Sequence, residues 1–66
     1  MGSEGTFKKN INIGLAVNIV KKQHQRSGEL TEGIVKRILT KSANHPYGIK
    51  VMLESGEVGR VQEILD

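Results

Sequence analysis

Two stretches of the chain alternate apolar and polar residues, which is the pattern of half-buried β-strands. In residues 15–20 every second side chain is Leu, Val or Ile, and two lysines then return the chain to the surface. Residues 49–54 show the clearest alternation, with Ile, Val and Leu separated by Lys, Met and Glu. The pattern therefore predicts one strand in the first third of the chain and another in the last third.

The segment from Leu30 to Lys41 fits two patterns, because its apolar residues would also line one face of a helix. Gly33 and the many β-branched residues favour a strand, since glycine costs a helix about 1 kcal/mol and branched side chains prefer extended backbone. We therefore predict a strand. The doubled apolar pairs at 34–35 and 38–39 break strict alternation, so we expect a bulge or a strong bend between them.

Three turn signals separate these segments. Residues 23–29 form a polar, glycine-containing loop, and residues 42–48 form a second loop that contains the only proline. A Ser-Gly pair at 55–56 is typical of a hairpin turn. Apolar residues then recur at every third position in 58–64, which predicts a short strand, a single 3₁₀ turn and a terminal strand.

These elements predict an all-β fold: a small SH3-like barrel of about five short strands, with a 3₁₀ turn near the C-terminus. Sixty-six residues make one domain close to the lower size limit for folding, and the absence of cysteine leaves Val, Ile and Leu to build the core. We expect residues 1–13, which lack a period, to be a flexible arm and residues 14–66 to form the barrel. The predicted interior comprises Val17, Ile19, Val35, Ile38, Ile49, Val51, Val58, Val61 and Ile64.

Charge is unevenly distributed along the chain. Residues 21–50 carry seven Lys or Arg against two Glu, a net +5, whereas residues 51–66 carry one Arg against four acidic residues, a net −3. A basic middle segment indicates a polyanionic partner, most often nucleic acid, although small domains also need surface charge for solubility. No apolar run approaches the roughly 20 residues that span a bilayer, and no signal peptide is visible, so we expect a cytoplasmic protein without a membrane partner.

The candidate binding residues lie in and beside the two longest loops. Arg26 and Arg60 carry planar guanidinium groups that suit phosphates or base edges, and Tyr47 beside His45 offers a stacking face for an unpaired base. With so few aromatic residues, binding would be mostly electrostatic, which favours structured RNA or a ribonucleoprotein as the partner over sequence-specific recognition of single strands. The predicted nucleic-acid-binding residues are Lys22, Arg26, Lys36, Arg37, Lys41, His45, Tyr47, Lys50 and Arg60.

Other functions stay open at this point. A protein-interaction module that docks on an acidic protein surface is the alternative, and each of the cations also has a purely structural alternative, such as an ion pair for Arg60. We do not expect an enzyme, because His45 with Ser42 or Thr40 lacks a third group to orient a base and a nucleophile. Two histidines without cysteine make a poor metal site, so we predict no catalytic residue, metal or cofactor, and we expect a monomer.

Part of the chain is similar to a KOW motif, and the residues that carry this resemblance are Val17-x-Ile19-Val20, Gly28 and Gly33-x-Val35-x-x-Ile38. KOW segments occur in ribosomal proteins and transcription-elongation factors. The resemblance implies an SH3-like barrel whose loops meet RNA or protein.

A larger part of the chain, from Gly14 to Ile64, resembles the YwbE-like family of small bacterial and archaeal proteins. The blocks that carry this resemblance are Gln25-Arg26-Ser27-Gly28, Leu30-Thr31-x-Gly33-x-Val35, Ile38-Leu39-Thr40-x-Ser42, His45-Pro46-x-Gly48-Ile49-Lys50-Val51 and Val58-Gly59-Arg60-Val61-Gln62. The chain departs from the family pattern at His24, where an acidic residue is usual, and at Met52, where a basic one is usual. The resemblance implies a single small domain and no particular activity.

Overall fold

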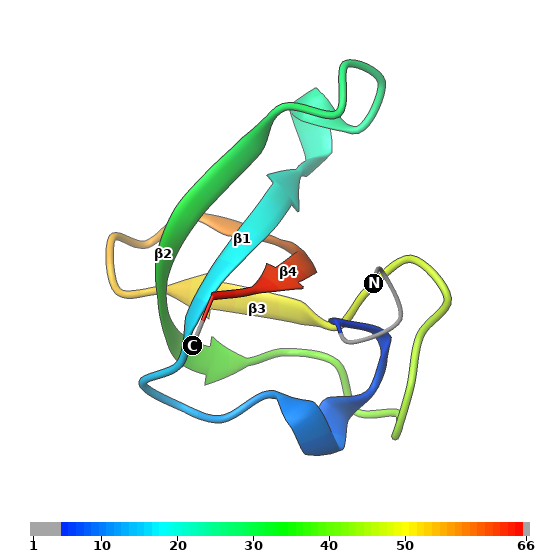
Figure 1. Cartoon of the computed structure of the whole chain (residues 1–66), viewed down its shortest axis with the longest axis vertical. Coiled ribbons are helices and arrows are strands. Elements are labelled where there is room, and N and C mark those ends of the chain that lie inside the picture. The colour runs from blue at the N-terminus through cyan, green and yellow to red at the C-terminus, as the bar shows by residue number, and fades with distance from the viewer. Residues whose placement is uncertain (1–4, 66) are drawn as a thin grey trace.

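The computed structural model describes residues 5–65, in which four antiparallel strands close into a small barrel (Figure 1). Its elements are η2 (Lys8–Asn10), β1 (Ala16–Lys21), η3 (Lys22–His24), β2 (Leu30–Ile38), β3 (Lys50–Leu53) and β4 (Val58–Ile64), where η denotes a short 3₁₀ helix. Each strand pairs with the next, and β4 returns to pair with β1. The predicted all-β barrel is confirmed.

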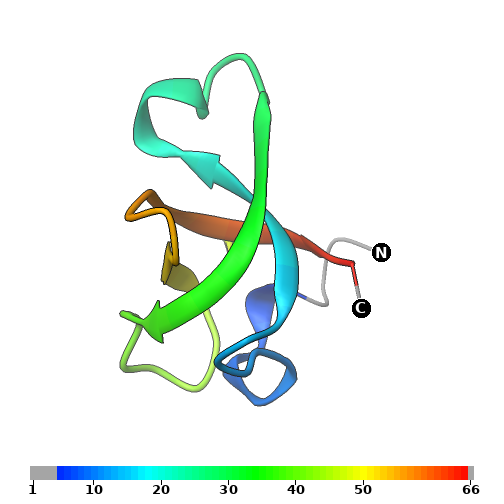
Figure 2. The ribbon, with the colours of Figure 1, turned by 90° about the vertical axis from the view of Figure 1, so that its left-hand side faces the viewer.

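Strand β2 is the longest strand and takes part in both halves of the barrel. Its first half pairs with β1 and its second half pairs with β3. The register shifts between Val35 and Arg37, which leaves Lys36 as an extra residue in a bulge and accompanies a strong bend of the strand (Figure 2). The prediction of a bulged or bent strand rather than a helix is therefore confirmed, although the strand ends at Ile38.

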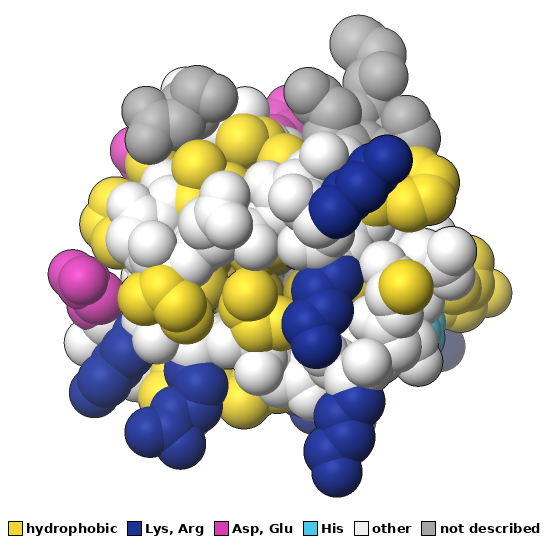
Figure 3. Space-filling model, turned by 90° about the horizontal axis from the view of Figure 1, so that it is seen from below, with side chains coloured by type: hydrophobic (Ala, Val, Ile, Leu, Met, Phe, Trp, Pro, Cys, Tyr) yellow, Lys and Arg dark blue, Asp and Glu magenta, His cyan; other side chains and the backbone are white. Residues whose placement is uncertain are grey.

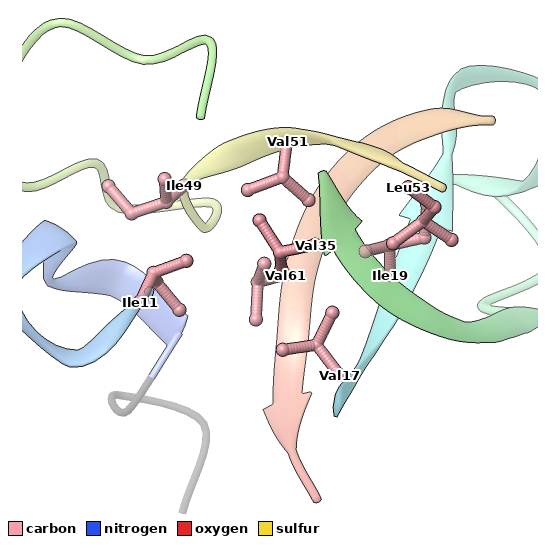
Figure 4. Packing of buried hydrophobic residues seen from close by; sticks show 8 residues of the cluster. All are labelled: Ile11, Val17, Ile19, Val35, Ile49, Val51, Leu53 and Val61. Atoms are coloured by element: carbon pink, nitrogen blue, oxygen red, sulfur yellow. The ribbon is translucent and has the colours of Figure 1, made fainter. Parts of the chain in front are cut away.

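Eight apolar side chains fill the barrel, and none of them is more than 3 % exposed (Figure 4). They are Ile11, Val17, Ile19, Val35, Ile49, Val51, Leu53 and Val61. Full burial of one such side chain contributes about 1.5–3 kcal/mol, so each is a sizeable part of the stability of a domain this small. Ile38 and Ile64, also predicted in the interior, are partly buried and pack against this cluster.

The interior differs from the prediction at two strand positions. Leu53 belongs to the core because Gly33, which lacks a side chain, leaves room for it: a Cβ on Gly33 would lie 2.5 Å from Leu53 Cδ1. Val58 was wrongly predicted inside. In β4 the buried, inward-facing positions are Gly59 and Val61, so Val58 falls on the outer side of the alternation and is only half-buried.

The strand count was also predicted wrongly, since the barrel has four strands and not five. The residues expected to form two short strands around a 3₁₀ turn form the single strand β4. A register shift against β1, between Asn18 and Ile19, places an extra residue at Gln62. This shift accounts for the three-residue spacing between Val61 and Ile64 without any helical turn. The 3₁₀ helices in the described residues are those that flank β1.

Residues 5–13 contact the barrel, which corrects the prediction of an arm that extends to residue 13. The amide of Ile49 donates to the carbonyl of Gly5 at 2.8 Å, and the amide of His45 donates to the carbonyl of Thr6 at 2.8 Å. The side chain of Ile11 then closes one end of the core. The segment lacks a period because it pairs through a few isolated hydrogen bonds rather than through a regular strand. Residues 1–4 lie outside the described residues.

Candidate nucleic-acid interface

One row of outward-facing residues crosses all four strands. Strand pairing sets Leu30 beside Val20, Val20 beside Arg60, and Arg60 beside Lys50. On β1, β3 and β4 an adjacent residue of the same strand (Ile19, Val51 and Val61) is buried in the core, which requires the row to lie on the outside of the barrel. The row carries two cations, from β3 and β4, beside two apolar side chains, from β1 and β2.

An open groove runs over this row, between the 22–29 loop and the 45–48 loop. Its main part has a volume of about 1110 Å³ and is lined by Val20, Gln25, Gly28, Leu30, His45, Pro46, Tyr47, Arg60, Gln62, Glu63, Ile64 and Leu65. A smaller continuation of about 410 Å³ shares Val20, Gln25 and Arg60 and extends to Lys22 and Lys50. We call these two parts together the groove. The two loops that flank it carry four of the nine candidate residues: Lys22, Arg26, His45 and Tyr47.

Two side chains of β4 hold the 45–48 loop in place. Arg60 Nη1 donates to the carbonyl of Gly48 at 3.1 Å, and Gln62 Nε2 donates to the carbonyl of Tyr47 at 3.0 Å. Gly48 itself has φ +106°, and a Cβ at this position would collide with the carbonyl oxygen of Val61. Only glycine allows the loop to lie this close to the strand. Arg60 thus has a structural contact, with a backbone carbonyl and not with the acidic neighbours considered from the sequence.

The two aromatic rings of the groove lie side by side at its rim. Tyr47 is 74 % exposed, and its ring centroid lies 5.9 Å from that of His45 at an interplanar angle of 51°. The amide of Tyr47 donates to His45 Nδ1 at 3.1 Å, which fixes the histidine within the turn. The hydroxyl oxygen of Thr40 likewise accepts a hydrogen bond from the amide of Lys50, at 2.7 Å. Tyr47 therefore presents an open face for stacking, while His45 serves the turn geometry.

The nine predicted residues do not gather on one surface. Figures 1 and 2 agree that the 22–29 loop, with Lys22 and Arg26, lies at the opposite end of the molecule from the end of β2 and the segment that follows it. That far end carries Lys36, Arg37 and Lys41. The reason is the length of β2, whose nine residues follow a path of up to about 26 Å. The longest extent of the molecule is 27 Å. Arg26 and Lys41 therefore cannot belong to one binding surface.

Two carboxylates near the groove contact basic side chains, and the Lys21–Glu57 contact is an ion pair. Lys21 Nζ lies 2.9 Å from Glu57 Oε2, and His24 Nε2 lies 3.2 Å from Glu29 Oε2. The hydrogen bond from Lys21, together with a second one from Ser55, lowers the pKa of the Glu57 carboxylate below its ordinary value. Within residues 5–65 no carboxylate pairs with the exposed cations among the predicted residues, which are Lys22, Arg26, Lys36, Arg37, Lys41 and Lys50.

The groove also contains residues that the sequence did not mark. Gln25, Gln62 and Leu30 line it; they stand in the blocks that carry the family resemblance, but they were not among the predicted binding residues. Glu63 brings a negative charge to the same surface, where it accepts a hydrogen bond from Asn18 Nδ2 at 2.8 Å. In the part of the chain that the structure describes, no three His, Asp or Glu side chains are close enough to hold a metal ion.

The fold and the groove together define a small all-β barrel with an open groove on its outer face. The chain belongs to the family described as "Uncharacterized conserved protein (DUF2196)", whose model matches residues 4–64. It is similar to "Uncharacterized protein YwbE" of Bacillus subtilis (strain 168), with 54 % identity over 61 residues, 92 % of this chain and 94 % of the relative. The predicted resemblance to the YwbE-like family is thus confirmed. No solved structure matches the chain. Among residues 5–65 no helix is long and apolar enough to cross a membrane.

Proposed function

We propose that this protein is a non-catalytic, cytoplasmic RNA-binding module whose groove holds an unpaired segment of a structured RNA. The observation that carries the proposal is the arrangement of the groove: an open tyrosine face at one rim, and cations on the floor and at the far end. Tyr47, His45 and Arg60 line its main part, and Lys22 and Lys50 line its continuation.

The groove offers the two kinds of contact that unpaired RNA needs. Tyr47, 74 % exposed, supplies a flat apolar face on which one base can stack. Lys50 and Lys22 supply mobile ammonium groups for phosphates on either side of Arg60. Because Arg60 already donates one N–H to Gly48, its remaining donors are held in a fixed direction above the groove floor. Stacking on a single aromatic residue tolerates any base, so we expect weak sequence preference.

We also propose that the barrel is of the SH3-like class and that its loops act as KOW loops do. Support comes from the small closed antiparallel sheet, the strong bend of β2, and the position of the groove between two loops at the barrel's surface. In such a barrel the strands fix the positions of the loops, and the loops carry the binding residues.

The test is a titration of labelled single-stranded RNA of about 10 nucleotides, followed by fluorescence anisotropy at low and moderate salt. Replacing Tyr47 by Ala removes a stacking face worth about 1–3 kcal/mol per base, so we expect about 5- to 150-fold weaker binding. Phe7→Ala is the matched control, because Phe7 is an aromatic residue that is 40 % exposed and does not line the groove. No binding at low salt, or equal losses in both variants, would reject the proposal.

Docking on an acidic protein surface is the second candidate function. The observation that favours it is the apolar rim of the same groove, where Leu30 is 41 % exposed and Leu65 is 45 % exposed. This alternative predicts that polyglutamate binds as tightly as RNA and that Tyr47→Ala weakens neither ligand. Preferential binding of RNA, sensitive to Tyr47, decides against it.

A further inference from the structure

The bulge in β2 places two consecutive cations on the outside of the barrel. In a regular strand, successive side chains point to opposite faces, so one of Lys36 and Arg37 would face the core. Here Val35 is opposite Leu53 and Arg37 is opposite Met52, so Lys36 is the extra residue of the bulge. Both cations are exposed as a result. The bulge thus adds one positive charge to the surface at this end of the molecule.

The N-terminal segment brings two more cations to the same end. The amide of Lys8 donates to the carbonyl of Ala43 at 2.8 Å, and Phe7 forms a β-bridge with Asn44. These contacts set η2, with Lys8 and Lys9, beside the segment that carries Lys41. We define the basal face as Lys8, Lys9, Lys36, Arg37 and Lys41. Its cations come from two parts of the sequence that are about thirty residues apart, so charge counting along the chain does not reveal it.

The basal face carries excess positive charge. Within residues 5–65 none of its five cations pairs with a carboxylate; Lys9 Nζ instead lies 5.8 Å from the centroid of the Phe7 ring. The sequence has no acidic residue between Glu4 and Glu29 or between Glu32 and Glu54, so both contributing segments are free of negative charge. Figure 3 views this end from below: Lys and Arg side chains reach outward around the face, and acidic side chains appear only toward its margins.

We propose that the basal face is a second RNA-binding surface, which contacts the phosphate backbone of a double-stranded segment and acts independently of the groove. None of its five cations lines either part of the groove, so the basal face is a distinct surface. Four of the five are lysines on flexible stems, which meet phosphates as point charges without reading sequence. A duplex presents a regular array of phosphates to such a surface.

The two surfaces together fit one class of ligand. The groove lies between the 22–29 and 45–48 loops, and the basal face lies at the other end of β2 from the first of these loops. A structured RNA offers both an unpaired segment and a duplex, so one molecule could contact both surfaces. The duplex contact does not depend on the proposed function of the groove, and each surface can be tested with an RNA that lacks the other feature.

The experiment compares two double variants that remove the same charge from different surfaces. Lys36→Gln with Lys41→Gln alters the basal face, and Lys22→Gln with Lys50→Gln alters the groove; all four side chains are exposed. Each variant is titrated with a blunt RNA duplex of about 16 base pairs and with a single strand of about 10 nucleotides. Far-UV circular dichroism checks that both variants keep the wild-type fold.

We expect the basal variant to bind the duplex about tenfold more weakly than the groove variant does. Its salt dependence should also be weaker, with the slope of log K against log salt smaller in magnitude by about 1–2. The single strand should show the reverse order. Equal losses of duplex binding in the two variants, or no duplex binding at low salt, would overturn the inference. Binding of the basal face to anionic phospholipid vesicles but not to the duplex would also overturn it. If the duplex binds as expected but the single strand does not bind, the proposed function of the groove is contradicted and the proposal for the basal face is supported.

Discussion

The contact between Gly33 and Leu53 makes a quantitative prediction about the core. Gly33 lies in β2 opposite Val17, and the side chain of Leu53 fills the space above it. A Cβ on Gly33 would lie 2.5 Å from Leu53 Cδ1, which is too close for two carbon atoms, and 3.1 Å from Leu53 Cγ, which is a tight contact. Gly33→Ala should therefore overpack the core and destabilise the domain by about 1–3 kcal/mol.

Truncation of Leu53, the partner of Gly33, leaves a cavity in the core. Leu53 is fully buried, and its truncation to Ala removes three carbons at about 0.8 kcal/mol each, before the cavity itself is counted. The total should reach about 2.7–5 kcal/mol. In the double variant the methyl group introduced by Gly33→Ala enters the space that Leu53→Ala vacates, so each change relieves the other. We expect the double variant to be destabilised by at least about 1 kcal/mol less than the sum of the two single destabilisations.

The assay is urea unfolding followed by far-UV circular dichroism, because the chain has no tryptophan and its one tyrosine is largely exposed. If Leu53→Ala unfolds the domain outright, the cycle is repeated with Leu53→Val, which keeps more of the side chain. Strictly additive effects of the two substitutions would show that these residues do not touch in the folded barrel. A stable Gly33→Ala variant would refute the close packing directly.

Three further outcomes follow from the structure. Gly48→Ala should destabilise the domain by at least about 1–3 kcal/mol and abolish single-strand binding, because φ is positive at Gly48 and a Cβ would overlap the Val61 carbonyl oxygen. A thermal unfolding midpoint equal to that of the wild type would contradict this prediction. Ile11→Ala should lower stability by about 2–5 kcal/mol in urea unfolding, whereas an arm detached from the barrel would give no change. Glu57→Gln should lower the unfolding midpoint above about pH 5 and make no difference well below pH 4; a constant difference at every pH would contradict it.

The pH dependence follows from the direction of the Glu57 shift. Its pKa is lowered in the folded state, chiefly by the hydrogen bond from Lys21, so the ionised carboxylate favours folding. This contribution is present above the pKa of the unfolded chain and is lost as the pH falls through the folded value. Because the pair lies at the surface, added salt should reduce the effect. Glu54→Gln is the matched control, since Glu54 lies in the same turn and has no cation partner in the described chain.

The sequence predicted the strands well where local patterns decide them. The glycine and β-branched residues of residues 30–38 correctly predicted the strand β2 despite a spacing that also fits a helix. The doubled apolar pairs at 34–35 and 38–39 correctly predicted a bulge between them, which lies at Lys36. The N-terminal segment could not be predicted in this way. Its contacts are single backbone hydrogen bonds to residues more than thirty positions away, and these leave no period in the sequence. Ile11 looked like an isolated apolar residue for the same reason.

The candidate site was predictable in its parts and not in its arrangement. The 22–29 and 45–48 loops could be recognised from turn residues and charge, and they flank the groove. Whether two charged loops lie on the same side depends on the direction and length of the strand between them. Strand β2 runs from one end of the molecule to the other, so it separates Lys22 and Arg26, which precede it, from Lys36, Arg37 and Lys41 at its far end. Likewise, the anchoring of the 45–48 loop by Arg60 depends on strand pairing that no local motif encodes.

Mapping of RNA contacts by nuclear magnetic resonance tests the central claim most directly. The amide signals of the ¹⁵N-labelled protein are recorded while single-stranded RNA is added at low salt. The account predicts shifts concentrated in residues 20–30, 45–50 and 58–65, which surround the groove, with small changes elsewhere. Shifts confined to η2 and residues 36–43, or no shifts at all, would contradict the claim that the groove binds unpaired RNA.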